Sequence, residues 1–168
     1  MITTEEYLRI RYSSTEQDMS SVKEYNKALL EKYPWLSPNN VWTGELSEDY
    51  DYEYTRADSI PRGWRLAFGD QMIEELDQLL KKYNVEDYQI LQIKEKYGGL
   101  RWYDNGFPRI GFDEYSTWVY KYEELSLNTC INCGKPAIGF TKGWISPLCK
   151  DCMKDMEYDP IETDKQTG

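Results

Sequence analysis

The sequence contains no histidine, and this single absence excludes several functional classes. Ser-His-Asp and Cys-His nucleophilic catalysis, histidine-ligated metals and histidine pH switches all require that side chain. The chain also has no P-loop, no G-x-G-x-x-G segment and no other nucleophile motif. Its 30 acidic side chains are most simply explained as solvated surface charge. We therefore expect that the protein is not an enzyme.

Long hydrophobic runs are also missing. No segment approaches the length of a transmembrane helix, and the first residues lack the basic and apolar regions of a signal peptide. We expect a soluble cytoplasmic protein without a membrane partner. Phenylalanine is scarce, with 4 Phe against 15 Tyr and 6 Trp. Tyr and Trp keep a polar group while burying a large surface, so they suit both the rim of a small core and a protein interface.

Basic residues are in the minority, because 20 Lys and Arg face 30 Asp and Glu and give a net charge of −10. No part of the chain is strongly basic, so broad attraction to nucleic-acid phosphates is not expected. Residues 45–58 form the most acidic window. Within it, tyrosines alternate with carboxylates: Tyr50, Asp51, Tyr52, Glu53, Tyr54. This period of two predicts an extended segment with tyrosines on one face and carboxylates on the other.

Two interpretations of this acidic segment remain open. An edge strand or solvated loop, whose charges discourage aggregation, is the commoner case. The functional alternative is a docking strip for a basic protein partner. The residues of that strip are Glu48, Asp49, Tyr50, Asp51, Tyr52, Glu53 and Tyr54.

Apolar residues spaced three and four apart predict three helices. The first covers residues 15–33, and Ser13 with Glu16 fits a capping box at its start. The second and clearest follows Gly63 and ends near Asn84. The third covers residues 113–127, with Asp113 as its N-terminal cap.

Between the second and third helices the pattern changes to that of a β-hairpin. A strand runs from Tyr88 to Tyr97, Gly98-Gly99 provides the turn, and residues 100–103 return. Basic and aromatic side chains mix on this hairpin: Lys94, Lys96, Arg101 and Trp102. Such a surface can clamp and stack on single-stranded nucleic acid, although the acidic chain as a whole opposes it.

The four cysteines are Cys130, Cys133, Cys149 and Cys152, in the spacing C-x₂-C-x₁₅-C-x₂-C. This spacing predicts a zinc site, because each C-x₂-C turn delivers two thiolates to a tetrahedral ion. Gly134 follows the second ligand and permits the left-handed backbone of a zinc knuckle. Two disulfides are the alternative, but nothing marks the chain as secreted. With four thiolates no coordination position stays open, so we expect one structural Zn²⁺.

Three blocks of the sequence resemble a known group of proteins. They are Gly63-Trp64, the phrase Ile93–Tyr103 (IKEKYGGLRWY), and the finger CxxCG…GW…LCxxC that ends at Cys152. The order resembles a family of small uncharacterised proteins of bacteriophages and prophages, in which a KEKFGGLRFY-like phrase precedes such a finger. The match covers residues 62–153. Trp102 stands where the family phrase usually has Phe, and Cys152 stands where some members have His.

The resemblance implies an accessory protein in the cytoplasm of a bacterial host, and it implies no catalytic residues. Together with the residue patterns it predicts an α+β fold: helices packed on a small antiparallel β-hairpin, with a C-terminal treble-clef or zinc-ribbon-like finger. We expect a helical and hairpin domain over 1–128, the finger over 129–157 and an acidic tail over 158–168. The predicted function is binding to a host protein and modulating it, for example by inhibition, through the acidic strip. A nucleic-acid-binding adaptor is the alternative.

Overall fold

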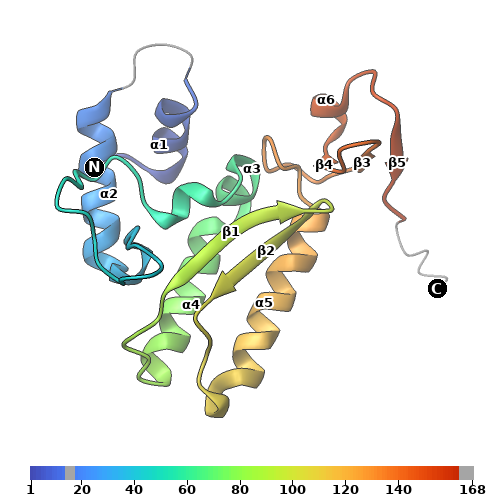
Figure 1. The fold of residues 1–168 in the computed structure, drawn as a ribbon. Coiled ribbons are helices and arrows are strands. Elements are labelled where there is room, and N and C mark those ends of the chain that lie inside the picture. Colours follow the sequence, from blue (N-terminus) through green and yellow to red (C-terminus); the bar gives the residue numbers. More distant parts are fainter. Residues whose placement is uncertain (14–17, 163–168) are drawn as a thin grey trace.

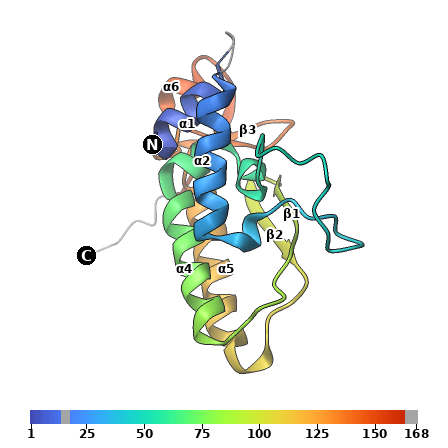
Figure 2. The same cartoon turned by 90° about the vertical axis from the view of Figure 1, so that its left-hand side faces the viewer.

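A β-hairpin lying across two long helices forms the centre of the molecule (Figure 1). The computed structural model describes residues 1–13 and 18–162. The hairpin consists of β1 (Ile90–Lys96) and β2 (Gly99–Asp104), and the helices are α4 (Asp70–Lys82) and α5 (Phe112–Leu127). Figure 2 shows that both helices lie on the same side of the hairpin. The fold is therefore α+β, as the sequence predicts.

The main core fills the space between the hairpin and these helices. Its largest fully buried side chains include Trp64, Met72, Ile73, Leu76, Ile90 and Leu100. The indole N–H of Trp118 donates to the Met72 carbonyl oxygen at 3.0 Å, which fixes α5 against α4. Buried Trp side chains need such a partner, because an unpaired N–H costs free energy in the core.

The predicted second helix forms over nearly its full length, but with a change of pitch. It consists of α3 (Arg62–Trp64), the π-helical turn η3 (Arg65–Gly69) and α4. The wider turn carries Arg65, whose side chain is buried. Arg65 pairs with Asp58 at 2.9 Å, and its guanidinium carbon lies 4.9 Å from the centre of the Tyr7 ring. A buried arginine needs such partners, since an uncompensated charge in the core is strongly destabilising.

Two N-terminal helices pack beside this turn (Figure 1): α1 (Thr4–Arg11) and α2 (Met19–Lys32). The Tyr7 and Tyr25 rings stack between them, 4.2 Å apart. The N-cap of α2 is Asp18, whose side chain accepts from the Ser21 backbone N–H. The predicted capping box falls in part outside the described residues, because Glu16 is not among them. Short 3-10 turns follow at η1 (Pro34–Leu36) and η2 (Arg56–Ser59).

The hairpin forms as predicted, with its turn one residue earlier. β1 and β2 are antiparallel, and Lys96 pairs with Gly99, so the turn residues are Tyr97 and Gly98. Both have positive φ, 53° and 84°, which is the type I′ turn favoured by the twist of a hairpin. The third helix, α5, also forms as predicted. Its cap is Gly111 without a side-chain hydrogen bond, so Asp113 lies in the first turn and the expected cap at Asp113 is wrong.

The acidic segment does not adopt the extended conformation that its period of two predicts. It is a loop, and Tyr52 has a φ of 58°, which breaks any strand at the middle tyrosine. The three tyrosines gather nevertheless, with the Tyr50 ring centre 5.2 Å from that of Tyr52 and 5.8 Å from that of Tyr54. The Asn26 side chain donates to the Tyr52 carbonyl at 2.9 Å and ties the bend to α2. Tertiary contacts therefore override the alternating pattern.

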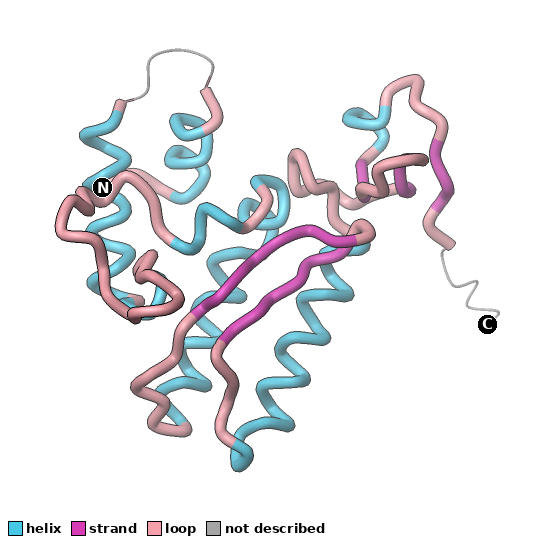
Figure 3. The backbone as a smooth tube through the Cα atoms, viewed as in Figure 1, coloured by secondary structure: helices cyan, strands magenta, loops and turns pink. Residues whose placement is uncertain are grey.

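The C-terminal part is a small sheet with a short helix, drawn at the right of Figure 3. It contains β3 (Gly139–Thr141), β4 (Pro147–Leu148), α6 (Lys150–Met153) and β5 (Tyr158–Pro160). The strand order is β4-β3-β5, with both pairs antiparallel. Knuckle, hairpin and helix follow one another as expected for a finger. The residues of β5, which we placed in the tail, add a third strand to it.

Candidate metal centre

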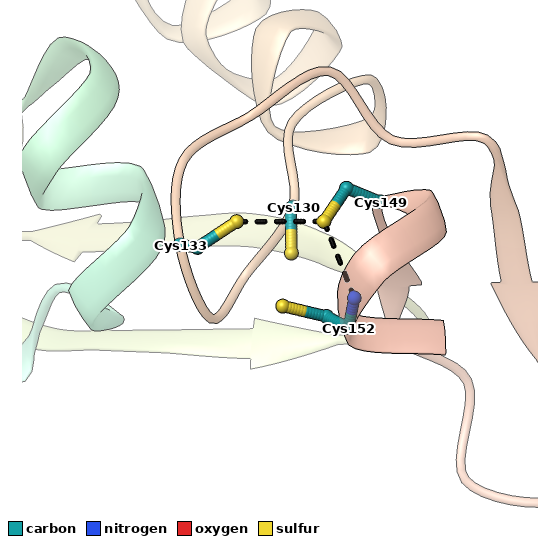
Figure 4. Close-up of side chains that lie close together, drawn as sticks. All are labelled: Cys130, Cys133, Cys149 and Cys152. Carbon is teal, nitrogen blue, oxygen red and sulfur yellow. Dashed lines mark hydrogen bonds between the residues drawn. The ribbon is translucent and has the colours of Figure 1, made fainter. Parts of the chain in front are cut away.

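The four cysteines converge on one point, although Cys130 and Cys152 are 22 positions apart in the sequence (Figure 4). Their sulfur atoms all lie within 4.8 Å of one another. Cys130 and Cys149 are buried, Cys133 and Cys152 are half-buried, and none of the four forms a disulfide. A small apolar cluster surrounds them, with Leu148 and Met153 among its buried members.

Two turns of different kinds supply the ligand pairs. In the first, the Gly134 backbone N–H donates to the Cys130 carbonyl at 3.0 Å, and Gly134 has a φ of 80°, the left-handed conformation that its position predicts. In the second, Cys149 is the N-cap of α6, and Cys152 lies in the following turn. The Cys152 backbone N–H points at the Cys149 sulfur, 3.4 Å away. A sulfur placed so at a helix N-terminus is stabilised as a thiolate.

The spacing of the sulfur atoms fits a tetrahedral ion. Metal–sulfur bonds of about 2.3 Å place the sulfurs of a tetrahedron about 3.8 Å apart. Cys133 and Cys149 sulfurs are 3.5 Å apart, far longer than the ~2.05 Å of a disulfide bond. The four side chains could therefore hold one metal ion with its coordination filled by protein.

The pKa values of these thiols reflect how close the four sulfur atoms are to one another. Burial raises the pKa of Cys149, but the Cys152 backbone N–H and the neighbouring thiols outweigh it and lower that pKa to about 7. Burial raises the pKa of Cys133, and burial together with the adjacent sulfurs raises that of Cys152. One thiolate forms readily while its neighbours resist ionisation. A bound cation would remove this conflict by neutralising the shared negative charge.

The knuckle is packed directly against α3. The Gly63 backbone N–H donates to the Ile131 carbonyl at 2.8 Å, and a Cβ at Gly63 would lie 2.2 Å from the Cys130 carbonyl oxygen. The indole N–H of Trp64 donates to the Thr129 carbonyl at 3.0 Å. Only glycine permits so close an approach of two backbones. The Gly63-Trp64 pair thus holds the turn that carries Cys130 and Cys133 against α3.

The tip of the central hairpin also touches the finger. A Cβ at Gly98 would lie 3.1 Å from side-chain atoms of both Phe140 and Ile145. The Gly63-Trp64 pair and the hairpin turn therefore both contact the finger, the first at the knuckle and the second at Phe140 and Ile145.

The basic and aromatic residues predicted on the hairpin divide between its two faces. Lys94 and Arg101 pair across the strands on the face turned away from the helices, and Lys96 shares their face. Trp102 points into the core, where it is 7% exposed and its indole N–H donates to the Tyr88 hydroxyl at 2.7 Å. The expectation that Trp102 contacts nucleic acid is therefore wrong, because alternation along β2 places it opposite Arg101.

The predicted acidic strip is exposed at Glu48, Asp49, Asp51, Glu53 and Tyr54, and half-buried at Tyr50 and Tyr52. Asp51 forms an ion pair with Lys23, so one carboxylate of the acidic strip already has a partner within the protein. Sequence reasoning missed Trp42, which is 90% exposed. The turn-forming Asn40 and Gly44 on either side of it were the signal that could have found it.

Comparison with protein-family models, curated proteins and solved structures finds no match to this chain. Within the described residues, no helix is both long and apolar enough to cross a bilayer.

Proposed function

We propose that the protein is a non-enzymatic, zinc-stabilised binding protein that attaches to a basic surface of another protein through residues 41–54, here called the acidic loop. The observation that carries this proposal is the exposure of Trp42, a residue that is 90% exposed in a loop rich in carboxylates. Trp is strongly enriched among the residues that dominate binding energy at protein interfaces. A tryptophan held in water is otherwise an unfavourable use of a large apolar side chain.

The turn that carries Trp42 is held by hydrogen bonds. The Asn40 side chain accepts from the backbone N–H groups of Trp42 at 2.8 Å and Thr43 at 3.1 Å, and the Gly44 N–H donates to the Asn40 carbonyl at 2.8 Å. Arg56 donates to the Asn39 carbonyl at 2.6 Å and fastens the base of the loop. A ligand group fixed before binding loses little conformational entropy on binding, which raises affinity.

Charge and apolar contact are combined in the acidic loop. Glu45, Glu48 and Asp49 are exposed, and so is Leu46, while Figure 2 shows the loop projecting beyond the hairpin. A negative rim around an apolar anchor favours a partner with a positive surface and speeds their encounter. We place this activity in the cytoplasm of a bacterial host, with a host protein modulated by the contact, because the sequence resembles phage and prophage accessory proteins.

Hydrogen bonds favour the ionised form of five carboxyl groups among the described residues. Each carboxyl group with a shifted pKa has it lowered: Glu6, Asp18, Glu74, Glu75 and Glu114. At Glu114, hydrogen bonds from Lys82 and Tyr83 account for the direction. A lowered pKa keeps these groups ionised at neutral pH, so they contribute to the negative charge of the protein.

The metal assignment is tested by elemental analysis of the protein as purified, which should give one zinc per chain. Iron or no metal in the purified protein would contradict the zinc proposal. The binding proposal is tested separately by affinity capture from bacterial lysate, followed by titration of the captured protein. Trp42→Ala should weaken that titrated affinity at least about thirtyfold, the effect of a residue worth 2 kcal/mol or more.

A charge variant sharpens this test. Glu48→Lys with Asp49→Lys should slow association, because it removes the attraction that steers the encounter. Glu31→Lys with Glu124→Lys makes the same charge change at exposed helical positions elsewhere and should leave binding nearly unchanged. If Trp42→Ala binds the captured protein as tightly as the unaltered chain, the acidic loop is not the interface.

A further inference from the structure

A second surface of the molecule has the opposite charge. On the open face of the hairpin, Lys94 and Arg101 stand directly across from one another, and Lys96 lies at the end of the same strand. None of these three forms an ion pair with a described residue, whereas Lys23, Lys82, Lys121 and Lys135 do. Like charges opposite each other destabilise a sheet. The chain has 30 carboxylates that could have paired with these cations. Because the three cations cluster without such a partner, they are available to bind an anion from another molecule.

Aromatic rings accompany these cations. The Lys94 ammonium lies 5.5 Å from the centre of the Tyr103 ring, and the Lys96 ammonium lies 5.6 Å from that of Tyr97. Tyr103 is exposed and Tyr97 is 71% exposed, so both rings are open to a ligand. Figure 1 shows no helix over this side of the hairpin. Rings and cations on a bare sheet are the arrangement that holds the bases and the phosphates of a single strand.

The finger extends this surface. The residue after Tyr97 is Gly98, which adjoins Ile145, and the residue before Ile145 is Trp144. Trp144 is 79% exposed, and the hydroxyl of Thr141 donates to its backbone carbonyl, which holds the loop. A third exposed ring is therefore carried by the residue next to Ile145, which contacts the hairpin turn. Its position depends on the fold of the finger.

We propose that this hairpin–finger face, formed by Lys94, Lys96, Tyr97, Arg101, Tyr103 and Trp144, binds a single strand of nucleic acid. The cations contact successive phosphates, and the exposed rings stack on bases, without reading a particular sequence. A duplex presents no unstacked bases to these rings and binds more weakly. An acidic polypeptide offers charge without bases, so the rings distinguish it from a nucleic acid.

Titration of the full-length metal-loaded protein with a fluorescent oligothymidylate of about 12 nucleotides tests the proposal. Lys94→Gln with Arg101→Gln should make the slope of log affinity against log salt shallower by about 1.4, and should weaken binding on the order of fiftyfold at about 50 mM salt. Trp144→Ala should weaken binding at least about fivefold with the salt slope unchanged, because it removes stacking and no charge.

Lys27→Gln with Arg109→Gln is the matched control, since both residues are exposed and lie off this face. It removes the same charge and should alter affinity far less. Circular dichroism and thermal melting establish that each variant is folded. The proposal is overturned if the oligothymidylate does not bind. It is also overturned if the Lys94/Arg101 and Trp144 variants both bind it as the unaltered protein does, or if polyglutamate binds as tightly.

Discussion

At the scale of single residues, Gly63 leaves the least room for an added Cβ among the glycines of the described residues. An added methyl group would meet the Cys130 carbonyl at 2.2 Å and Ile131 backbone atoms at 2.6 Å. We predict that Gly63→Ala lowers the free energy of unfolding by about 2 kcal/mol or more, because α3 and the knuckle must separate. It should also weaken metal retention, measured by competition with a chromophoric chelator.

Gly143→Ala is the control for this substitution. Gly143 has a φ of 82° but no atom within 4 Å of an added Cβ, so alanine there suffers backbone strain without overlap. It should cost about 1 kcal/mol of stability and leave metal retention unchanged. Equal metal affinity in the Gly63 and Gly143 variants would show that the contact with α3 does not support the metal site.

At the scale of elements, the hairpin turn carries a residue that its geometry disfavours. Tyr97 has a φ of 53°, whereas a type I′ turn prefers Asn before Gly98. We predict that Tyr97→Asn raises the free energy of unfolding by about 0.5–1 kcal/mol, measured by chemical denaturation. The same variant should bind the oligothymidylate more weakly. A variant that is less stable than the original would mean that the Tyr97 ring supports the fold itself.

The elements with strong periodicity could be predicted from the sequence, and those set by distant contacts could not. The helix after Gly63 was predicted because its apolar residues repeat over many positions, and the hairpin because Gly98-Gly99 separates two strand-like runs. The π turn at Arg65 was not, since it depends on the distant partners Asp58 and Tyr7. The prediction of an extended acidic segment failed for a related reason. The Tyr52 carbonyl accepts a hydrogen bond from Asn26, which is distant in the sequence, and this contact favours a bend. The cysteine cluster was predictable because ligand spacing is a local constraint.

At the scale of the whole molecule, unfolding caused by loss of the metal should reach some elements and not others. The knuckle is linked to the core through the hydrogen bond from Gly63 to Ile131 and the one from Trp64 to Thr129. We predict that chelation unfolds residues 130–156 and raises amide exchange at Gly63, because its acceptor belongs to the knuckle. The α4 amides, which belong to a helix packed against α5, should stay protected.

Hydrogen–deuterium exchange with and without chelator measures this directly, and restoring zinc should reverse it. Exchange in residues 130–156 that is indifferent to the chelator would show that the finger folds without metal. Uniform loss of protection, including the middle of α4, would show that the finger and the helical core unfold as one cooperative unit.

The six tryptophans divide into two groups that should differ in their fluorescence. Trp35, Trp64, Trp102 and Trp118 each donate an indole N–H to a protein acceptor. Trp42 and Trp144 stand in water, one on the acidic loop and one on the hairpin–finger face. Indoles in water emit at longer wavelengths than buried indoles, so the long-wavelength side of the emission band comes mainly from these two residues. Their emission gives each surface a built-in reporter, and replacing either one by Phe assigns the signal without adding a dye.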